Sequence, residues 1–331
     1  GGTFNGGGLA YSDIQGNIYT VSISGSNTFD TIKLKPGNIL ALAAGTLQKI
    51  KNIVAAGTCG NWITIQSSSA GEQAGLTSNT GTIALTYVKL KDLSAAGGAT
   101  FNATNAIDQG NNTGWNITQV ASRTLFWVGN SGNWDQTAHW SLTSGGAGGE
   151  CIPNERDSVV VNDASFTLAN QQIMFNSTAN FKSMVWTITA AHRLSGNSYR
   201  TINCYGSFIL NSFVNITNLT DCYLYFKTNE KGHKINTVNK QVNMNVYFDG
   251  SGSWTLLDSL RLKTGASPYY IIQYNKGTLT TNNYGITCQQ FDSYSKEKRT
   301  LNLGSSRINS VSSWNFQDST NLTINAGSSV I

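Results

Sequence analysis

Short apolar runs recur along this chain at nearly constant intervals, and this repeat constrains the fold more than any other feature. Toward the C-terminus the runs lie at Leu260, Leu279, Leu301 and Leu322. Near the N-terminus they lie at Ile23, Leu42, Ile63 and Ile83. The C-terminal intervals are about 19 to 22 residues, which is typical of stacked supersecondary units. We therefore expect a repeat protein.

Each run has the alternation of a β-strand. Apolar residues alternate with Thr, Ser, Asn or Lys, and Gly or Asn stands at the ends of the runs. One such unit cannot cover its own apolar face, so neighbouring units must stack on it. The spacing leaves no room for helical crossovers between strands. The sequence thus predicts an all-β chain folded as a parallel β-helix, also called a β-solenoid.

Composition supports an all-β chain. Charged residues make up 12% of the 331 residues, about half the usual share. Asn outnumbers even Gly, and both residue types favour turns. Surface helices normally carry many Glu and Lys side chains, which are scarce here. No long amphipathic helical pattern is visible.

The repeat divides the chain into three stretches. Residues 1–121 and 166–331 are predicted to form β-solenoid modules. Residues 122–165 interrupt the repeat with a Trp- and Gly-rich segment, which is predicted to be a junction between them. The pattern leaves open whether the two modules form one continuous helix or bend at the junction.

Three tryptophans in this segment, Trp127, Trp134 and Trp140, have two interpretations. They can pack as a small core, because aromatic side chains bury large areas. Alternatively, they can form an exposed platform on which sugar rings stack. The first interpretation is favoured because a short segment with three tryptophans needs a core of its own, and the second makes these residues candidate glycan-binding residues.

Several spaced elements carry a resemblance to known modules. Residues 57–68, 87–92 and 110–115 follow one another in the order found in right-handed parallel β-helix modules. The chain in this region resembles such modules in phage tail or fibre proteins and in large bacterial surface proteins. Residues 129–141 are similar to Trp- and Gly-rich repeats of the same class. The resemblance implies a solenoid fold, an extracellular or virion setting and often a trimer, and it carries over no catalytic residue.

Catalytic chemistry has little support in the sequence. A solenoid enzyme acting on polysaccharide needs paired carboxylates on one face, whereas nearly all 17 acidic residues stand singly. The candidate groups are Asp249 with Asp258, Glu155 with Asp157 and Asp163, and Asp292 with Asp318. We expect them to cap or solvate the backbone, and we predict no catalytic residue and no enzyme activity.

Cofactor and metal sites are not predicted either. The glycine-rich runs lack the Lys-Ser/Thr pair that follows a phosphate-binding loop. His139, His192 and His233 are too far apart for a metal-ligand motif. Cys204 and Cys222 are about one turn apart and are expected to be buried thiols rather than a disulfide. Asn residues in N-x-S/T triplets, such as Asn116, Asn215 and Asn321, are expected to form hydrogen-bonded ladders between turns.

The net charge of +5 is dispersed. Its densest patch, residues 296–299, is expected to be a solvated loop, with contact to a phosphate or an acidic glycan as the alternative. Basic and aromatic residues do not interleave as in RNA-binding proteins, so nucleic acid is not an expected partner. No apolar run is long enough to span a membrane, and no signal peptide is visible.

These observations favour a structural and adhesive β-solenoid segment of a virion fibre, a tail or another extracellular appendage. Weak multivalent contact with cell-surface glycans fits the many hydroxyl and amide side chains. The alternatives are a secreted bacterial adhesin and a polysaccharide lyase or hydrolase on the same scaffold. Both ends read as mid-repeat sequence, so we expect further repeats, copies of the chain or neighbouring appendage subunits to cover them.

Overall fold

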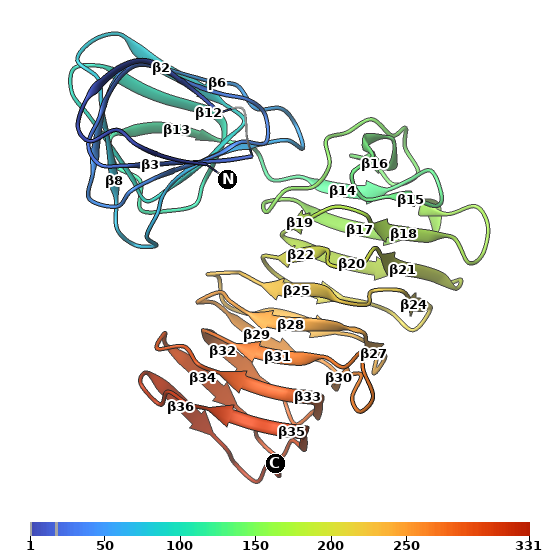
Figure 1. The fold of residues 1–331 in the computed structure, drawn as a ribbon. Helices are drawn as coiled ribbons and strands as arrows, with labels where there is room; N and C mark the ends of the chain where they lie inside the picture. Colours follow the sequence, from blue (N-terminus) through green and yellow to red (C-terminus); the bar gives the residue numbers. More distant parts are fainter. Residues whose placement is uncertain (1, 17–18) are drawn as a thin grey trace. The chain divides into compact units, whose positions relative to one another are not determined.

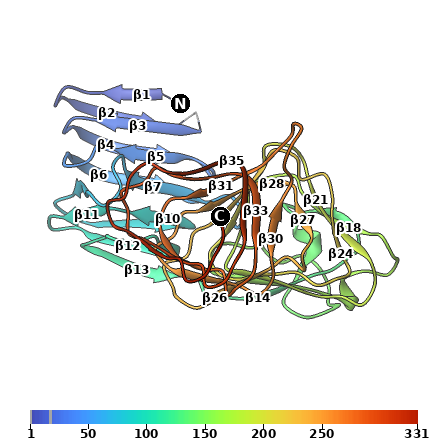
Figure 2. The same cartoon turned by 90° about the horizontal axis from the view of Figure 1, so that it is seen from below.

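The computed structural model describes residues 2–16 and 19–331. They divide into two compact units, 1–121 and 122–331. Almost all of the regular structure in both units is parallel β-sheet, wound as a β-solenoid of about 15 turns over the described residues. The predicted fold class is therefore confirmed. Figure 1 shows the stacked strands of the second unit, and Figure 2 shows those of the first.

The first unit has two sheets, so each of its first turns contributes two strands. One sheet contains β1 (Gly2–Asn5), β3 (Thr20–Ser24), β5 (Ile39–Leu42), β7 (Ile63–Ser67), β10 (Val88–Lys91), β12 (Thr100–Asp108) and β13 (Trp115–Gln119), with β9 (Thr82–Thr86) paired to β12. The other sheet contains β2 (Ala10–Gln15), β4 (Thr28–Leu34), β6 (Leu47–Ala55), β8 (Ala74–Thr77) and β11 (Leu93–Ala96). The strands expected around Ile23, Leu42, Ile63 and Ile83 all lie in the first of these sheets.

The second unit has three sheets. The first contains β14 (Thr124–Trp127), β16 (Trp140–Ser141), β17 (Ser158–Asn162), β20 (Ser183–Thr187), β23 (Phe208–Ile209), β26 (His233–Asn236), β29 (Ser253–Leu256), β32 (Gly277–Thr280), β34 (Arg299–Asn302) and β36 (Leu322–Asn325). The second contains β15 (Gly132–Asn133), β18 (Gln172–Phe175), β21 (His192–Gly196) and β24 (Val214–Ile216). The third contains β19 (Ala179–Phe181), β22 (Thr201–Cys204), β25 (Cys222–Phe226), β28 (Met244–Phe248), β31 (Ile271–Tyr274), β33 (Ile286–Ser293), β35 (Ile308–Phe316), β30 (Leu260–Leu262) and β27 (Gln241–Val242).

The core of each unit follows from the period-2 alternation of its strands. In β25, Cys222, Leu224 and Phe226 point inward and are buried, whereas Tyr223 and Tyr225 point outward. Parallel pairing in register places inward residues of successive turns above one another, about 4.8 Å apart. Leu279, for example, pairs with Leu301, and Leu301 pairs with Ile324. Burying Leu279 or Leu301 contributes about 1.5–3 kcal/mol relative to leaving the side chain exposed, whereas Ile324 in the last turn is 39% exposed.

Register corrects one part of the predicted repeat. Leu279, Leu301 and Leu322 lie in β32, β34 and β36 of one sheet, but Leu260 lies in β30 of another sheet. The interval from Leu260 to Leu279 therefore joins two sides of the solenoid. The in-register interval in the first sheet of this unit varies from 21 residues between β26 and β29 to 34 residues between β14 and β17.

The Trp- and Gly-rich segment lies within the second unit. Its strand β14 pairs in parallel with β17, and β15 pairs in parallel with β18. β16 runs antiparallel to β14, with Trp127 opposite Trp140. The two short 3₁₀ helices, η1 (Thr137–His139) and η2 (Asp163–Ser165), also lie here. In the part of the chain that the structure describes, no helix has the length and apolarity to cross a membrane.

Cys204 and Cys222 are buried free thiols, as expected. They do not stack on each other, because Cys204 is in register with Phe226 and Cys222 is in register with Met244. Burial raises the pKa of the Cys204 thiol to about 12, so this sulfur stays protonated near neutral pH.

Candidate functional site

The three tryptophans of the 122–165 segment form a packed core. Trp127, Trp134 and Trp140 have no exposed area. Trp140 meets Trp127 and Trp134 edge-on, with ring centroids 5.1 and 4.7 Å apart, and its indole Nε1 donates to the Trp134 carbonyl at 2.9 Å. The imidazole of His139 stacks on Trp127 at 4.6 Å. A ring with no exposed face cannot stack on a sugar, so the exposed glycan platform considered for these residues is wrong.

The acidic residues near the start of the second unit are held by structural contacts. Asp157 is fully buried, and its carboxylate accepts hydrogen bonds from Arg123 and from the backbone and side chain of Asn154. Asp163 accepts from the backbone and hydroxyl of Thr189. These carboxylates connect loops of adjacent turns, and the buried Asp157 is closed to a substrate.

The fold also uses Asp249 and three further acidic candidates. Asp249 accepts from Asn275 Nδ2 at 3.5 Å. Asp258 is 6% exposed and accepts from the backbone N–H groups of Thr237 and Asn239. Asp292 is 4% exposed and accepts from Ser313. Asp318 caps a turn by accepting from the backbone N–H of Thr320, and the pKa of Asp318 is lowered chiefly by its hydrogen bonds to Thr320.

The basic patch at residues 296–299 divides into two parts. Residues 296–298 are an exposed loop between β33 and β34. Arg299 is fully buried, and its guanidinium donates to the carbonyls of Asp318 and Thr320 at 2.7 and 2.9 Å. This arginine therefore clamps the loop of the next turn, and it is not available to a ligand.

An outward aromatic stack lies on the third sheet of the second unit. Tyr225 and Tyr247 are in register on β25 and β28, and their rings stack with centroids 4.4 Å apart. Tyr223 lies 6.2 Å from Tyr247. All three side chains are partly exposed. The alternation of β25 could have indicated this stack, but which residues meet across turns depends on register.

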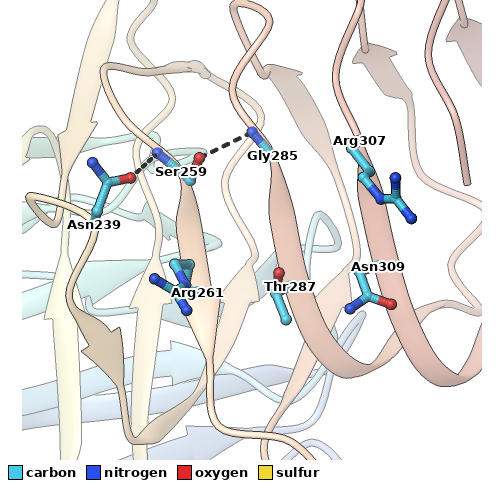
Figure 3. A pocket seen from close by; sticks show the side chains of 7 residues that line it. All are labelled: Asn239, Ser259, Arg261, Gly285, Thr287, Arg307 and Asn309. Carbon is cyan, nitrogen blue, oxygen red and sulfur yellow. Dashed lines mark hydrogen bonds between the residues drawn. The ribbon is translucent and has the colours of Figure 1, made fainter.

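A polar groove lies across β30, β33 and β35 of the second unit (Figure 3). Its volume is about 370 Å³, and it is open to solvent. The lining residues are Asn239, Ser259, Arg261, Gly285, Thr287, Arg307 and Asn309. We call it the Arg261–Arg307 groove. Neither arginine was singled out from the sequence.

Strand register assembles this groove from residues far apart in the chain. Arg261 on β30 is in register with Thr287 on β33, and Thr287 is in register with Asn309 on β35. Arg307 lies two residues before Asn309, beside Gly285. Because Gly285 has no side chain, the space between Ser259 and Arg307 stays open. A Cβ at Gly285 would lie 3.1 Å from the Arg307 carbonyl oxygen and 3.6 Å from Ser259 Oγ.

Two hydrogen bonds hold the polar groups at one end of the groove (Figure 3). The backbone N–H of Ser259 donates to Asn239 Oδ1 at 3.3 Å, and the N–H of Gly285 donates to Ser259 Oγ at 3.2 Å. The amide NH₂ of Asn239 and the hydroxyl proton of Ser259 are left to donate to a ligand. Arg261 and Arg307 are exposed, and within the described residues neither is paired with a carboxylate.

A metal centre is not formed in the described parts of the chain: no three His, Cys, Asp or Glu side chains there are placed to hold an ion. His192 is buried against Phe166, with ring centroids 4.0 Å apart, and His233 contacts Thr228 and Glu230. The chain matches no protein-family model, no curated protein and no solved structure.

Proposed function

We propose that this chain is a structural and adhesive β-solenoid segment of a virion fibre, a tail or another extracellular appendage. The observation that carries the proposal is the uninterrupted parallel pairing of the second unit. Its first sheet continues through ten strands from β16 to β36, and every pair in this sheet beyond β14 is parallel. Continuous pairing of this kind gives a stiff element with few loose loops, which suits a load-bearing rod.

Parallel pairing also repeats outward side chains along each side of the solenoid. Successive turns are about 4.8 Å apart, so a glycan chain lying along the solenoid can contact several turns at once. Tyr223, Tyr225 and Tyr247 are partly exposed on one such side, where a sugar chain can contact their ring edges and hydroxyl groups. Each contact is weak, but many copies bind strongly together. We infer that the side faces contact a cell-surface glycan.

A polysaccharide lyase or hydrolase on this scaffold is less well supported. Such an enzyme needs two carboxylates about 5 to 9.5 Å apart in a substrate groove. Asp157 and Asp258 instead accept hydrogen bonds from the fold, and the Arg261–Arg307 groove is lined by no carboxylate. A secreted bacterial adhesin would share this fold and differ only in its setting.

The proposal is tested by measuring binding and cleavage together. Fluorescently labelled full chain is added to cells before and after mild periodate oxidation, which destroys sugar diols, and reducing ends released from purified polysaccharides are counted. Binding that disappears after periodate, with no release of reducing ends, supports the adhesive function. Release of reducing ends would favour the enzyme instead, and binding unchanged by periodate would rule out a glycan receptor.

The setting is tested by immunogold labelling of the source material. Gold on filaments, tails or fibres supports an appendage, whereas gold confined to the cell interior contradicts it. Gold on the bacterial envelope without particles would favour the secreted adhesin.

A further inference from the structure

We propose that the Arg261–Arg307 groove binds the carboxylate or sulfate groups of an extended acidic polysaccharide. This inference rests on the proposed adhesive function for its class of ligand, and it adds the location of the site and the charge of the sugar. It is carried by four features of the groove: its hydrogen-bonding character, its unpaired charge, its direction across the strands and its lack of aromatic side chains.

The hydrogen-bonding groups of the groove are mostly donors. The side-chain acceptors Asn239 Oδ1 and Ser259 Oγ are already used by the backbone N–H groups of Ser259 and Gly285. What remains toward solvent is the Asn239 amide NH₂, the hydroxyls of Ser259 and Thr287, the amide of Asn309 and two guanidinium groups. A ligand rich in acceptors, and above all an anion, satisfies such a set.

The charge of the groove is not neutralised by the protein. The carboxylate of Asp258, one residue before Ser259, is buried and accepts from the backbone N–H groups of Thr237 and Asn239. It does not line the groove, so the positive potential of Arg261 and Arg307 faces solvent. The planar guanidinium group can donate two parallel hydrogen bonds to one carboxylate or sulfate, which a lysine cannot.

The direction of the groove favours a chain-like ligand. Its floor crosses three successive turns through Arg261, Thr287 and Asn309, which are neighbours in register. The two arginines stand on β30 and beside β35, one on each side of β33 (Figure 3). A polysaccharide lying along the solenoid can place one acidic group at each arginine, with its hydroxyls at Ser259 and Thr287.

The lining residues favour a polysaccharide over a nucleic acid as the ligand. Single-stranded nucleic acids are held by bases stacked on aromatic side chains as well as by charge. None of the seven residues that line the groove is aromatic. Small hydroxyl and amide side chains between two arginines instead match the acidic groups and hydroxyls of a sugar chain.

The test is affinity electrophoresis of the full chain in gels containing polygalacturonate, dextran sulfate, neutral dextran or no polymer, with a DNA duplex measured by mobility shift. The test variant is Arg261→Gln/Arg307→Gln. The matched control is Lys231→Gln/Lys234→Gln, which removes the same charge from exposed positions outside the groove. Arg307→Lys keeps the charge but removes the two parallel N–H donors of the guanidinium group. Circular dichroism checks that all variants are folded.

We expect the natural chain to be retarded by an acidic polymer and not by neutral dextran. Each arginine lost should weaken binding by about tenfold, as for a hydrogen bond to a charged group. The control double variant should change binding by less than about twofold because its charges lie on another part of the surface and are screened. Stronger retardation by polygalacturonate or by dextran sulfate supports the proposal in either case and identifies the anion.

Three results would overturn the inference. Equal weakening by the lysine control would mean that net charge, and not the groove, determines binding. A DNA duplex bound more tightly than either acidic polymer, and lost in the arginine variant, would assign the groove to nucleic acid. Retardation by neutral dextran alone, unchanged in the arginine variant, would reject the groove and leave the adhesive function standing.

Discussion

Arg123 and Asp157 form a buried ion pair at the beginning of the second unit. Arg123 Nη2 donates to Asp157 Oδ2 at 2.7 Å, and Arg123 Nε donates to Oδ1 at 3.2 Å. The Asp157 side chain is fully buried, and that of Arg123 is 18% exposed. The pair connects the segment that precedes β14 to the loop before β17, so it holds together the first two turns of this solenoid.

We expect Asp157→Ala to destabilise the second unit by about 3–5 kcal/mol, because the variant leaves the Arg123 guanidinium without its buried partner. Urea unfolding followed by near-ultraviolet circular dichroism measures the change. The control is Glu230→Ala, which breaks the Lys182–Glu230 pair, whose side chains are 36% and 61% exposed. That change should cost about 0–1 kcal/mol, and equal costs for the two variants would contradict this role for Asp157.

The tryptophan core gives a second prediction. Trp134 touches Trp140, Phe175 and Phe181, so Trp134→Ala should open a cavity and cost about 3–5 kcal/mol. Leu142→Ala in the same segment should cost no more than about 0.5 kcal/mol, because Leu142 is 50% exposed. Glycan binding by the folded Trp134 variant should equal that of the natural chain. If the Trp134→Ala variant is fully folded but no longer binds glycan, the assignment of this residue to the core is contradicted.

The strands of the repeat were predictable because alternation is local. Leu279 and Leu301 could be placed on one column from the sequence, since the turns between β32, β34 and β36 have nearly equal lengths. Leu260 was misplaced because a solenoid turn with three sides contains several apolar runs, and an interval alone does not say which side a run occupies. The interval pattern also does not reveal the second sheet of the first unit, for the same reason.

The sequence does not predict the Arg261–Arg307 groove, for a related reason. Alternation alone indicates that Arg261, between Leu260 and Leu262, points outward, and Arg307 before Ile308 likewise. Their proximity depends on the number of residues in each corner, which has no simple sequence signal. The tryptophans show the opposite case, because a large aromatic side chain in a short segment favours burial regardless of register.

Two histidines make stability depend on pH. Burial lowers the pKa of His192, against opposing effects of Asp163 and a backbone hydrogen bond, and burial also lowers the pKa of His233. The unfolded chain therefore binds more protons than the folded chain below the ordinary histidine pKa of about 6.5. Stability is full above that value and falls as the pH decreases through it. We expect a lower urea midpoint at about pH 5.5 than at about pH 7.

His192→Phe keeps the ring contact with Phe166 and removes the titrating group. Combined with His233→Asn, it should remove most of the difference between the urea midpoints at these two pH values. If the urea midpoint of the double variant changes with pH as much as that of the natural chain, other groups cause the pH dependence. A midpoint that rises as the pH falls would contradict the direction of both pKa shifts.

Side-chain ladders between turns give the last prediction. Asn325 Nδ2 donates to Asn302 Oδ1 at 2.7 Å, and Asn302 Nδ2 donates to Thr280 Oγ1 at 3.0 Å. Asn116 donates to Asn102 in the same way in the first unit, so the ladder expected at Asn116 is confirmed. Asn215 and Asn321 instead contact Lys240 and the Lys296 carbonyl. Each such bond contributes about 0.5–1.5 kcal/mol to stability.

Asn302→Ala removes both bonds of the central rung and should cost about 1–2 kcal/mol, whereas Asn325→Ala removes one and should cost less. Because the two residues share a bond, the double variant should cost less than the sum of the single variants by at least about 0.5 kcal/mol. Urea unfolding of the four proteins measures this coupling. Strict additivity would mean that the two amides stabilise the last turns independently and that the ladder adds nothing to the backbone pairing of β34 with β36.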